Sequence, residues 1–227
     1  MTSPCALAIE AATDQFSLAA CRGVKSVCWE ARPARDETQR VYEHAARLLA
    51  QADASLEDLD FVAFGCGPGS FTGVRVAAAA AQAIAFARSI PVCRISTLAV
   101  MAAGAGRVTG ASLVATCLDA RMERAYIALY RLAPSHRPVA VLRDALVDPR
   151  EFMLPGDEAF MAVGGGWLAY PDILARHGSR VAALDAGLLP SARDLLSMAI
   201  PEFSAGRTVT AQEALPEYLG QRPAIGA

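Results

Sequence analysis

Short apolar runs separated by polar or glycine-containing turns open the chain. Runs at 5–11, 16–22 and 25–31 predict an antiparallel meander, because each has strand length and is bounded by a turn signal. Helical spacing of apolar residues follows over 36–53. The remainder of this half predicts, in order, a buried strand at 61–66, a glycine-rich turn at 67–73, an alanine-rich helix at 74–87, a strand at 91–95 and a helix at 96–105. This order indicates a mixed sheet with helices on its faces.

The second half partly repeats this order. Gly104, Gly106 and Gly110 lie in a stretch of small residues that indicates a lobe boundary, so we expect one lobe at 1–105 and another at 106–227. The pattern predicts a second meander at 111–120, 124–132 and 139–147, a short strand ending at 164–166, and helices at 167–176 and 191–205. A duplicated α/β fold follows, in which the C-terminal segment can pack back on the first lobe.

The alanine-rich helix has almost no polar face. Between Val74 and Ala87 only Arg75 and Gln82 are polar, and a helix that is apolar all round is buried on both sides. A fully internal helix would explain this. We favour a protein–protein interface, because the helix over 36–53 is also apolar on two stripes. The residues assigned to this interface are Val41, Ala45, Leu48, Val74, Ala77, Ala78, Ala81 and Ala85.

Composition and charge exclude several classes of protein. The 54% hydrophobic and 19% charged content excludes an intrinsically disordered chain, and the net charge of −2 excludes an autonomous nucleic-acid binder. The longest apolar tract, 76–87, is far shorter than the about 20 residues of a membrane span. The 6 cysteines form no Cys-x-x-Cys pair and most lie in strand-like runs, so we expect buried thiols in a reducing compartment. The chain is expected to be cytoplasmic, without contact to a membrane.

The segment after the 61–66 strand is the most informative part of the chain. A strand that leads through glycines into a helix can present backbone N–H groups to an anion. The segment lacks the lysine of a Walker A loop and the glycines that flank the serine of a nucleophile elbow. A tight structural turn and an anion-binding loop both stay open, and we favour the turn, with a positive φ expected at Gly69. The residues concerned are Gly67, Pro68, Gly69, Ser70, Phe71, Thr72, Gly73 and Arg75.

Side chains that could carry catalysis are sparse. No histidine has a second histidine at helical spacing, which excludes a zincin-like metal site. Asp119 and Glu123 flank Arg121, and we interpret them as a hairpin held by its own salt bridges rather than as a Mg²⁺ or acid–base pair. Glu10 ends the first predicted strand as a single carboxylate, which is weak evidence for a metal site.

Three segments together resemble the TsaB (YeaZ) family. They are LAIEAATDQFSLA at 7–19, GCGPGSFTGVRVAAA at 65–79 and LDARMERAYIALY at 118–130, and weaker matches follow at 163–167 and 216–220. Asp119, Arg121 and Tyr126 belong to the third segment. The resemblance implies the actin-like, Hsp70-like ATPase fold (ASKHA, RNase H-like), with two lobes that each contain a mixed sheet and flanking helices.

The resemblance also implies a function. Members of the family are non-catalytic relatives of TsaD, the enzyme that transfers threonylcarbamoyl to the adenosine 3′ of the anticodon in tRNA. They pair with TsaD through the two helices of the first lobe, can self-associate through the same helices, and are joined by the small ATPase TsaE. The resemblance therefore implies an accessory subunit that meets tRNA only through the complex. It carries no cofactor or metal of its own, and ATP and metal are expected in the partner subunits.

The chain departs from the family pattern in two places. Glu10-Ala11-Ala12-Thr13 stands where the family has Asp-Thr-Ser-Thr, which removes groups from the position where ATPases of this fold hold Mg-phosphate. Tyr218-Leu219-Gly220 stands where the family ends in Tyr-Leu-Arg. The alternatives are an ATPase of the same fold, which would need that phosphate-site Asp, and a glycoprotease-like peptidase, for which no nucleophile–base pair is available.

Overall fold

Two five-stranded mixed sheets form the protein, in a computed structural model that describes residues 4–32, 37–134 and 137–220. The first sheet has the order β3-β2-β1-β4-β5. The pairs β1–β2 and β2–β3 are antiparallel, whereas β1–β4 and β4–β5 are parallel. Its strands are β1 (Cys5–Glu10), β2 (Phe16–Arg22), β3 (Lys25–Ala31), β4 (Phe61–Gly65) and β5 (Val92–Ile95).

The second sheet repeats this topology strand for strand, with the order β8-β7-β6-β9-β10. Again the first three strands are antiparallel and the last two pairs are parallel. Its strands are β6 (Leu113–Arg121), β7 (Arg124–Leu132), β8 (Pro138–Val147), β9 (Phe160–Val163) and β10 (Val181–Asp185). The predicted α/β class, two mixed sheets with flanking helices, is confirmed, although β10 was not predicted.

Helices connect and cover the strands. A 3-10 turn over Glu37–Arg40 precedes α1, and Asp36, where we expected this helix to begin, lies outside the described residues. Two more 3-10 turns cover Leu56–Asp58 and Gly178–Arg180. The helices are α1 (Val41–Gln51), α2 (Phe71–Arg88), α3 (Thr97–Thr109), α4 (Gly166–Ala169), α5 (Pro171–His177) and α6 (Ala192–Ser204). None of those in the described ranges is long and apolar enough to cross a membrane.

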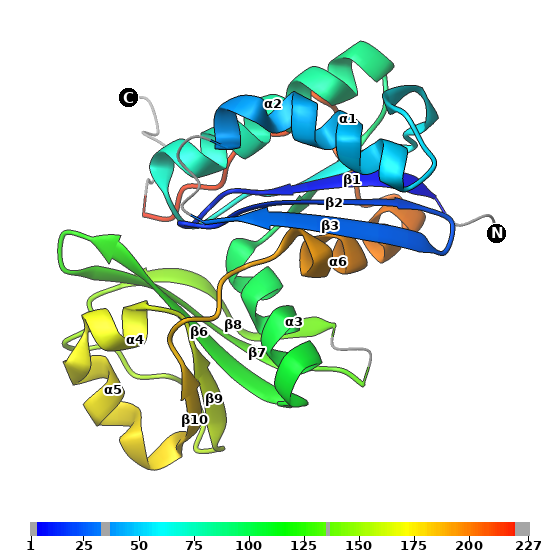
Figure 1. Ribbon diagram of the computed structural model, residues 1–227. Coiled ribbons are helices and arrows are strands. Elements are labelled where there is room, and N and C mark those ends of the chain that lie inside the picture. The colour runs from blue at the N-terminus through cyan, green and yellow to red at the C-terminus, as the bar shows by residue number, and fades with distance from the viewer. Residues whose placement is uncertain (1–3, 33–36, 135–136, 221–227) are drawn as a thin grey trace.

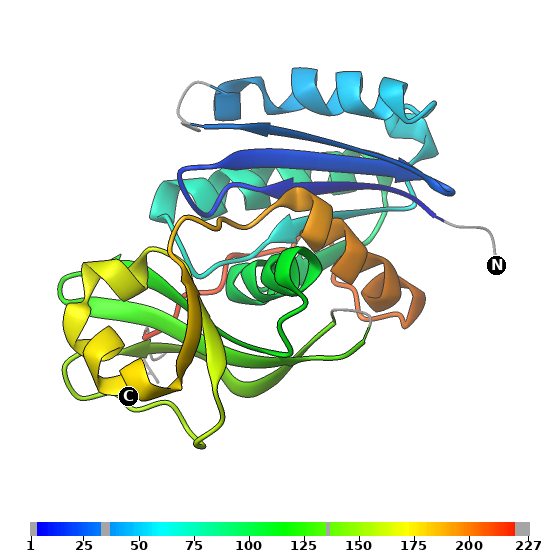
Figure 2. The same cartoon turned by 60° about the horizontal axis from the view of Figure 1, so that its bottom comes forward.

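The layers show how the two lobes are joined (Figures 1 and 2). Helices α1 and α2 cover one face of the first sheet, and α6 covers its other face although it follows the second sheet in the chain. Helix α3 lies between the lobes, because Val100 packs in the core of the first sheet while Leu98 and Met101 pack in that of the second. The segment after α6 then returns to β5, where Val92 and Val209 exchange two backbone hydrogen bonds of 2.9 Å.

Candidate functional site

The glycine-rich segment brings the first turn of α2 onto the turn that follows β1. The N–H of Ser70 donates a 2.7 Å hydrogen bond to the carbonyl oxygen of Ala12. A Cβ atom on Gly69 would lie 2.3 Å from that oxygen, and one on Gly73 would lie 1.8 Å from the carbonyl oxygen of Ala11. No side chain larger than hydrogen fits at either glycine unless the backbone moves. The two glycines therefore serve a close backbone approach.

Two details of this segment differ from the sequence-based expectation. The positive φ lies at Gly67 (+103°) and not at Gly69, whose requirement is purely steric. Helix α2 begins at Phe71 and not at Val74, because the Ser70 side chain caps it by accepting a 3.3 Å hydrogen bond from the N–H of Gly73. Phe71, Thr72 and Gly73 thus belong to the helix. A serine N-cap three residues before a glycine is the signal that could have located this start.

Glu10 is enclosed at the end of β1. The residue is fully buried, and its carboxylate accepts hydrogen bonds from the N–H of Ala12 (2.8 Å) and the hydroxyl of Thr97 (3.4 Å). Gly65 leaves the space for it, since a Cβ there would lie 1.9 Å from Oε2. Burial raises the pKa of Glu10 to about 7, against the hydrogen bonds that lower it. The carboxyl group is packed into the protein and does not face an open phosphate site.

The eight residues assigned to a partner interface point inward, so that assignment is wrong at the level of residues. All of them are buried within the single chain, at 5% exposure or less, and all but Val74 belong to the core that α1 and α2 share with the first sheet. Because alanine covers both sides of α2, the sequence offers no polar face to tell its inner from its outer side. The inward-facing residues are Val41, Ala45, Leu48, Val74, Ala77, Ala78, Ala81 and Ala85.

The outer side of α2 is nonetheless largely apolar, and it continues onto α1 as an apolar stripe beside the exposed ion pair of Glu43 and Arg47. Along α2, exposed side chains recur at helical spacing, with alanines in the middle and a phenylalanine at each end. Phe71 is 63% exposed, Phe86 70% and Tyr42, on α1, 51%. We call this surface the outer face. It comprises Tyr42, Ala46 and Ala50 of α1, and Phe71, Arg75, Ala79, Ala83 and Phe86 of α2.

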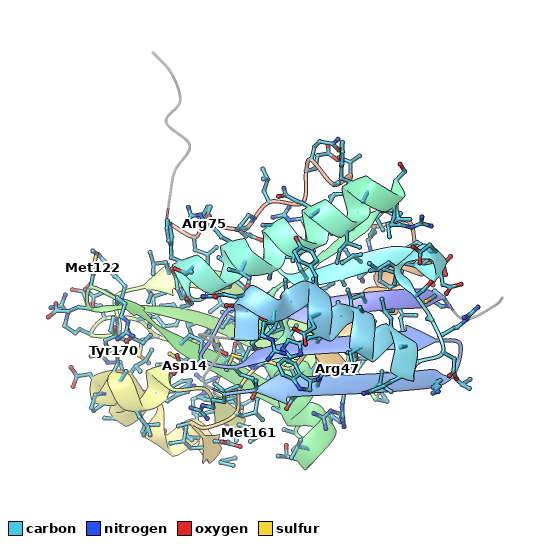
Figure 3. All side chains as sticks on the ribbon, turned by 45° about the horizontal axis from the view of Figure 1, so that its top comes forward. Asp14, Arg47, Arg75, Met122, Met161 and Tyr170 are labelled. Atoms are coloured by element: carbon cyan, nitrogen blue, oxygen red, sulfur yellow. The ribbon has the colours of Figure 1, made fainter. Side chains whose placement is uncertain are left out.

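Arg75 joins the outer face to the C-terminal segment. Its guanidinium lies 3.2 Å from the ring centre of Phe71 and 5.1 Å from that of Tyr218, and the two rings are 6.2 Å apart. Figure 3 shows Arg75 near the beginning of α2. The stack holds a positive charge and two aromatic rings together at one end of the outer face. Tyr218 was noted only as part of the chain's C-terminal motif, and no local pattern indicated its contact with α2.

Asp119 organises the β6–β7 hairpin. Its carboxylate accepts hydrogen bonds from the N–H of Arg121 (2.7 Å) and the hydroxyl of Tyr170 (2.6 Å), and it forms an ion pair with Arg121. Partial burial opposes ionisation, but these contacts together hold the pKa of Asp119 below its usual range. The expected salt bridge inside the hairpin therefore exists for Asp119. Glu123 instead pairs with Arg150, at 3.2 Å.

The remaining motif residue lies apart from this cluster. Tyr126 packs with the core between α3 and the second sheet. Sequence reasoning missed Tyr170, which lies near the hairpin that carries Met122 (Figure 3). Met122 is 94% exposed at the tip, and it and both of its neighbours have positive φ values. The hairpin thus ends in an exposed tip whose three residues have left-handed backbone conformations.

Comparison of the chain with known proteins identifies its family. The model of the family described as TsaD, tRNA N6-adenosine threonylcarbamoyltransferase, matches residues 32–171. The protein from Escherichia coli named tRNA threonylcarbamoyladenosine biosynthesis protein TsaB is 37% identical over 219 residues, which cover 94% of this chain and 93% of the relative. The chain belongs to the TsaB family. The TsaB protein of Haemophilus influenzae is 33% identical over 94% of this chain and 92% of its own length.

A solved structure from the TsaB (YeaZ) family supports the assignment. YeaZ from Pseudomonas aeruginosa superimposes with a TM-score of 0.85 at 35% identity, over 96% of this chain and 100% of that one. Because the match spans both lobes, the order of sheets and helices described above is that of the TsaB family.

Proposed function

We propose that this chain is an accessory subunit in the biosynthesis of threonylcarbamoyladenosine in tRNA. In this proposal it pairs with a TsaD-type catalytic subunit that transfers threonylcarbamoyl to the adenosine 3′ of the anticodon. The observation that carries the proposal is the outer face of α1 and α2. A helix can approach closely over Ala79 and Ala83, while the rings of Phe71 and Phe86 stand at the two ends as large apolar contacts.

The same proposal holds that the chain is not itself a catalyst. Ala11 and Ala12 pack directly on the first turn of α2, and the Glu10 carboxyl group is enclosed, so an ATP phosphate would have to displace backbone there. Within the described ranges, no group of three or more His, Cys, Asp or Glu side chains could hold a metal ion. These features speak against the alternatives of an ATPase and a peptidase.

Further partners complete the proposal. ATP and metal would act in the partner subunits, a TsaE-type ATPase would join the pair, and tRNA would be reached only through the complex. A second copy of this chain could use the same outer face when the catalytic subunit is absent. The six free cysteines, five of them buried, fit the reducing cytoplasm in which we expect the complex to work.

Arginine substitutions on the outer face test the proposal. Ala83→Arg and Ala46→Arg place a charge on α2 and α1 where the partner would exclude water, whereas Ala175→Arg places one on an exposed position of α5 in the other lobe. We expect the first two variants to fold, to lose binding to a TsaD-type subunit by about 2 kcal/mol or more, and to lose tRNA modification in the reconstituted complex. Ala175→Arg should behave like the unaltered chain. If both outer-face variants bound the TsaD-type subunit as tightly as the unaltered chain, the proposal would be contradicted.

A further inference from the structure

A pocket lies between helices α3 and α6, beside the connection between β7 and β8. It has a volume of about 470 Å³ and is lined by Ala103 and Arg107 of α3, Arg137 from the connection between β7 and β8, and Asp194, Ser197, Met198 and Pro201 of α6. Helix α6 packs on the first sheet and α3 also packs on the second, so both lobes contribute walls. Small-molecule sites commonly have this size and occur at such junctions.

The charges around the pocket do not balance. Arg107 binds Asp194 through two hydrogen bonds of 2.6 and 3.0 Å, so that carboxylate, only 4% exposed, is neutralised. Asp194 also lies in the first turn of α6, where the helix dipole favours a negative charge. Glu202 is held by Arg207 at 2.5 and 2.9 Å and contacts Arg137 at 3.3 Å. In these ion pairs three guanidinium groups thus share two carboxylates, because Arg137 and Arg207 have Glu202 in common.

The excess charge belongs to Arg137. Its only ion pair within the described residues is the 3.3 Å contact with a carboxylate that Arg207 already binds through two hydrogen bonds. The Arg137 side chain is 55% exposed and borders the pocket, so most of its donors are free to bind a ligand. Apart from the charged groups, the lining consists of the apolar Ala103, Met198 and Pro201 and of Ser197, whose hydroxyl donates to the carbonyl oxygen of Asp194.

We propose that this pocket binds a small monocarboxylate with a short aliphatic body. The carboxylate would take hydrogen bonds from Arg137 and from the guanidinium nitrogen of Arg107 that Asp194 does not use, and the aliphatic body would lie against Met198 and Pro201. A single negative charge matches the single uncompensated guanidinium, whereas a cation would be repelled and a neutral molecule would leave that charge unpaired. A bound ligand would touch α3 and α6 at once. The inference does not depend on the outer face or on its partner.

Isovalerate is a suitable probe, with isovaleramide as its uncharged match. Titration followed by amide NMR should give saturable shifts for the full chain that are confined to residues of α3, α6 and the β7–β8 connection. The affinity should fall about tenfold or more with isovaleramide and with Arg137→Gln, which corresponds to one lost charged hydrogen bond. Arg143→Gln removes an exposed arginine on β8 that does not line the pocket, and should leave the affinity unchanged.

The same titration distinguishes two sources of the carboxylate. A short acetylated peptide that ends in valine carries the same group at a chain terminus, so tighter binding of the peptide than of isovalerate assigns a chain terminus as the ligand. Weaker binding of the peptide assigns a free small molecule. Shifts that do not saturate, equal affinity for isovaleramide, or an equal loss with Arg143→Gln would each overturn the site.

Discussion

Ser70 and Ala12 are joined by a backbone hydrogen bond of 2.7 Å that ties the start of α2 to the turn after β1. The bond can form only because Gly69 and Gly73 present no side chain to the carbonyl groups of Ala12 and Ala11. The glycines therefore act on stability, because they allow this close approach of two backbone segments.

Gly73→Ala tests this role. Its methyl group would lie 1.8 Å from the carbonyl oxygen of Ala11, and that backbone cannot move without disturbing β1. We expect a loss of about 3 kcal/mol in the free energy of unfolding, measured by urea denaturation. The matched control is Gly178→Ala, because a Cβ there meets nothing within 4 Å and its φ is not positive, so stability should change by less than about 0.5 kcal/mol. Equal effects of the two variants would contradict the steric argument.

Ser70→Ala, which removes only the helix cap, should lower the free energy of unfolding by about 1 kcal/mol.

Glu10→Gln should stabilise the protein at neutral and alkaline pH. The pKa of Glu10 is raised by burial from 4.5 to about 7 in the folded state, so between these values the unfolded chain has released a proton that the folded protein retains. The penalty therefore grows as the pH rises from 4.5 to 7 and is complete above 7. Glutamine avoids it, and its side-chain oxygen can still accept from the N–H of Ala12.

Urea denaturation of both proteins across this pH range measures the effect. The variant should gain an order of 1–3 kcal/mol over the unaltered chain at pH 8, and the difference should shrink towards pH 4.5. A difference that does not vary with pH would show that Glu10 does not carry the titration.

Local patterns account for much of this fold. Both meanders, the strands β4, β5 and β9 and the helices follow from apolar runs of strand length or from helical spacing, although the helix predicted at 167–176 is divided into α4 and α5. Strand β10 was not predicted, because its residues are mostly exposed at a sheet edge, where an apolar pattern is not required.

Long-range contacts were harder to predict. Nothing near Tyr218 indicates that it meets Phe71 and Arg75, since the contact joins segments that are far apart in the chain. The orientation of α2 was wrong for a different reason: with alanine on all sides, burial is decided by packing against the first sheet, which the helix sequence does not encode.

Leucine substitutions at Ala77 and Ala79, one buried and one exposed position of α2, test this corrected orientation. Ala77 is fully buried against the first sheet, so Ala77→Leu forces three extra carbon atoms into a packed core and should destabilise the protein by about 2 kcal/mol. Ala79 belongs to the outer face, and Ala79→Leu should change stability by less than about 0.5 kcal/mol. Thermal and urea unfolding of both variants provide the comparison. If Ala79→Leu destabilised the protein more than Ala77→Leu, then Ala79 and not Ala77 would be the residue packed against the first sheet.

Tyr170→Phe should loosen the β6–β7 hairpin in a pH-dependent way. The hydroxyl donates to Asp119 at 2.6 Å and lies 2.8 Å from the carbonyl oxygen of Arg124, so its removal should cost about 1–2 kcal/mol at pH 7. The pKa of Asp119 lies below its ordinary value of 3.8, so its contribution is present above 3.8 and is lost as the pH falls through the folded-state value. The penalty should therefore be smaller at an acidic pH below the folded-state pKa of Asp119 than at pH 7, and that pKa, followed by NMR of the side-chain carboxyl carbon, should rise in the variant. Tyr42→Phe is the control, because the exposed Tyr42 hydroxyl has no hydrogen bond in the described part of the chain. A Tyr170→Phe penalty that is equal at both pH values, with an unmoved Asp119 titration, would mean that the ring of Tyr170 and not its hydroxyl supports the hairpin.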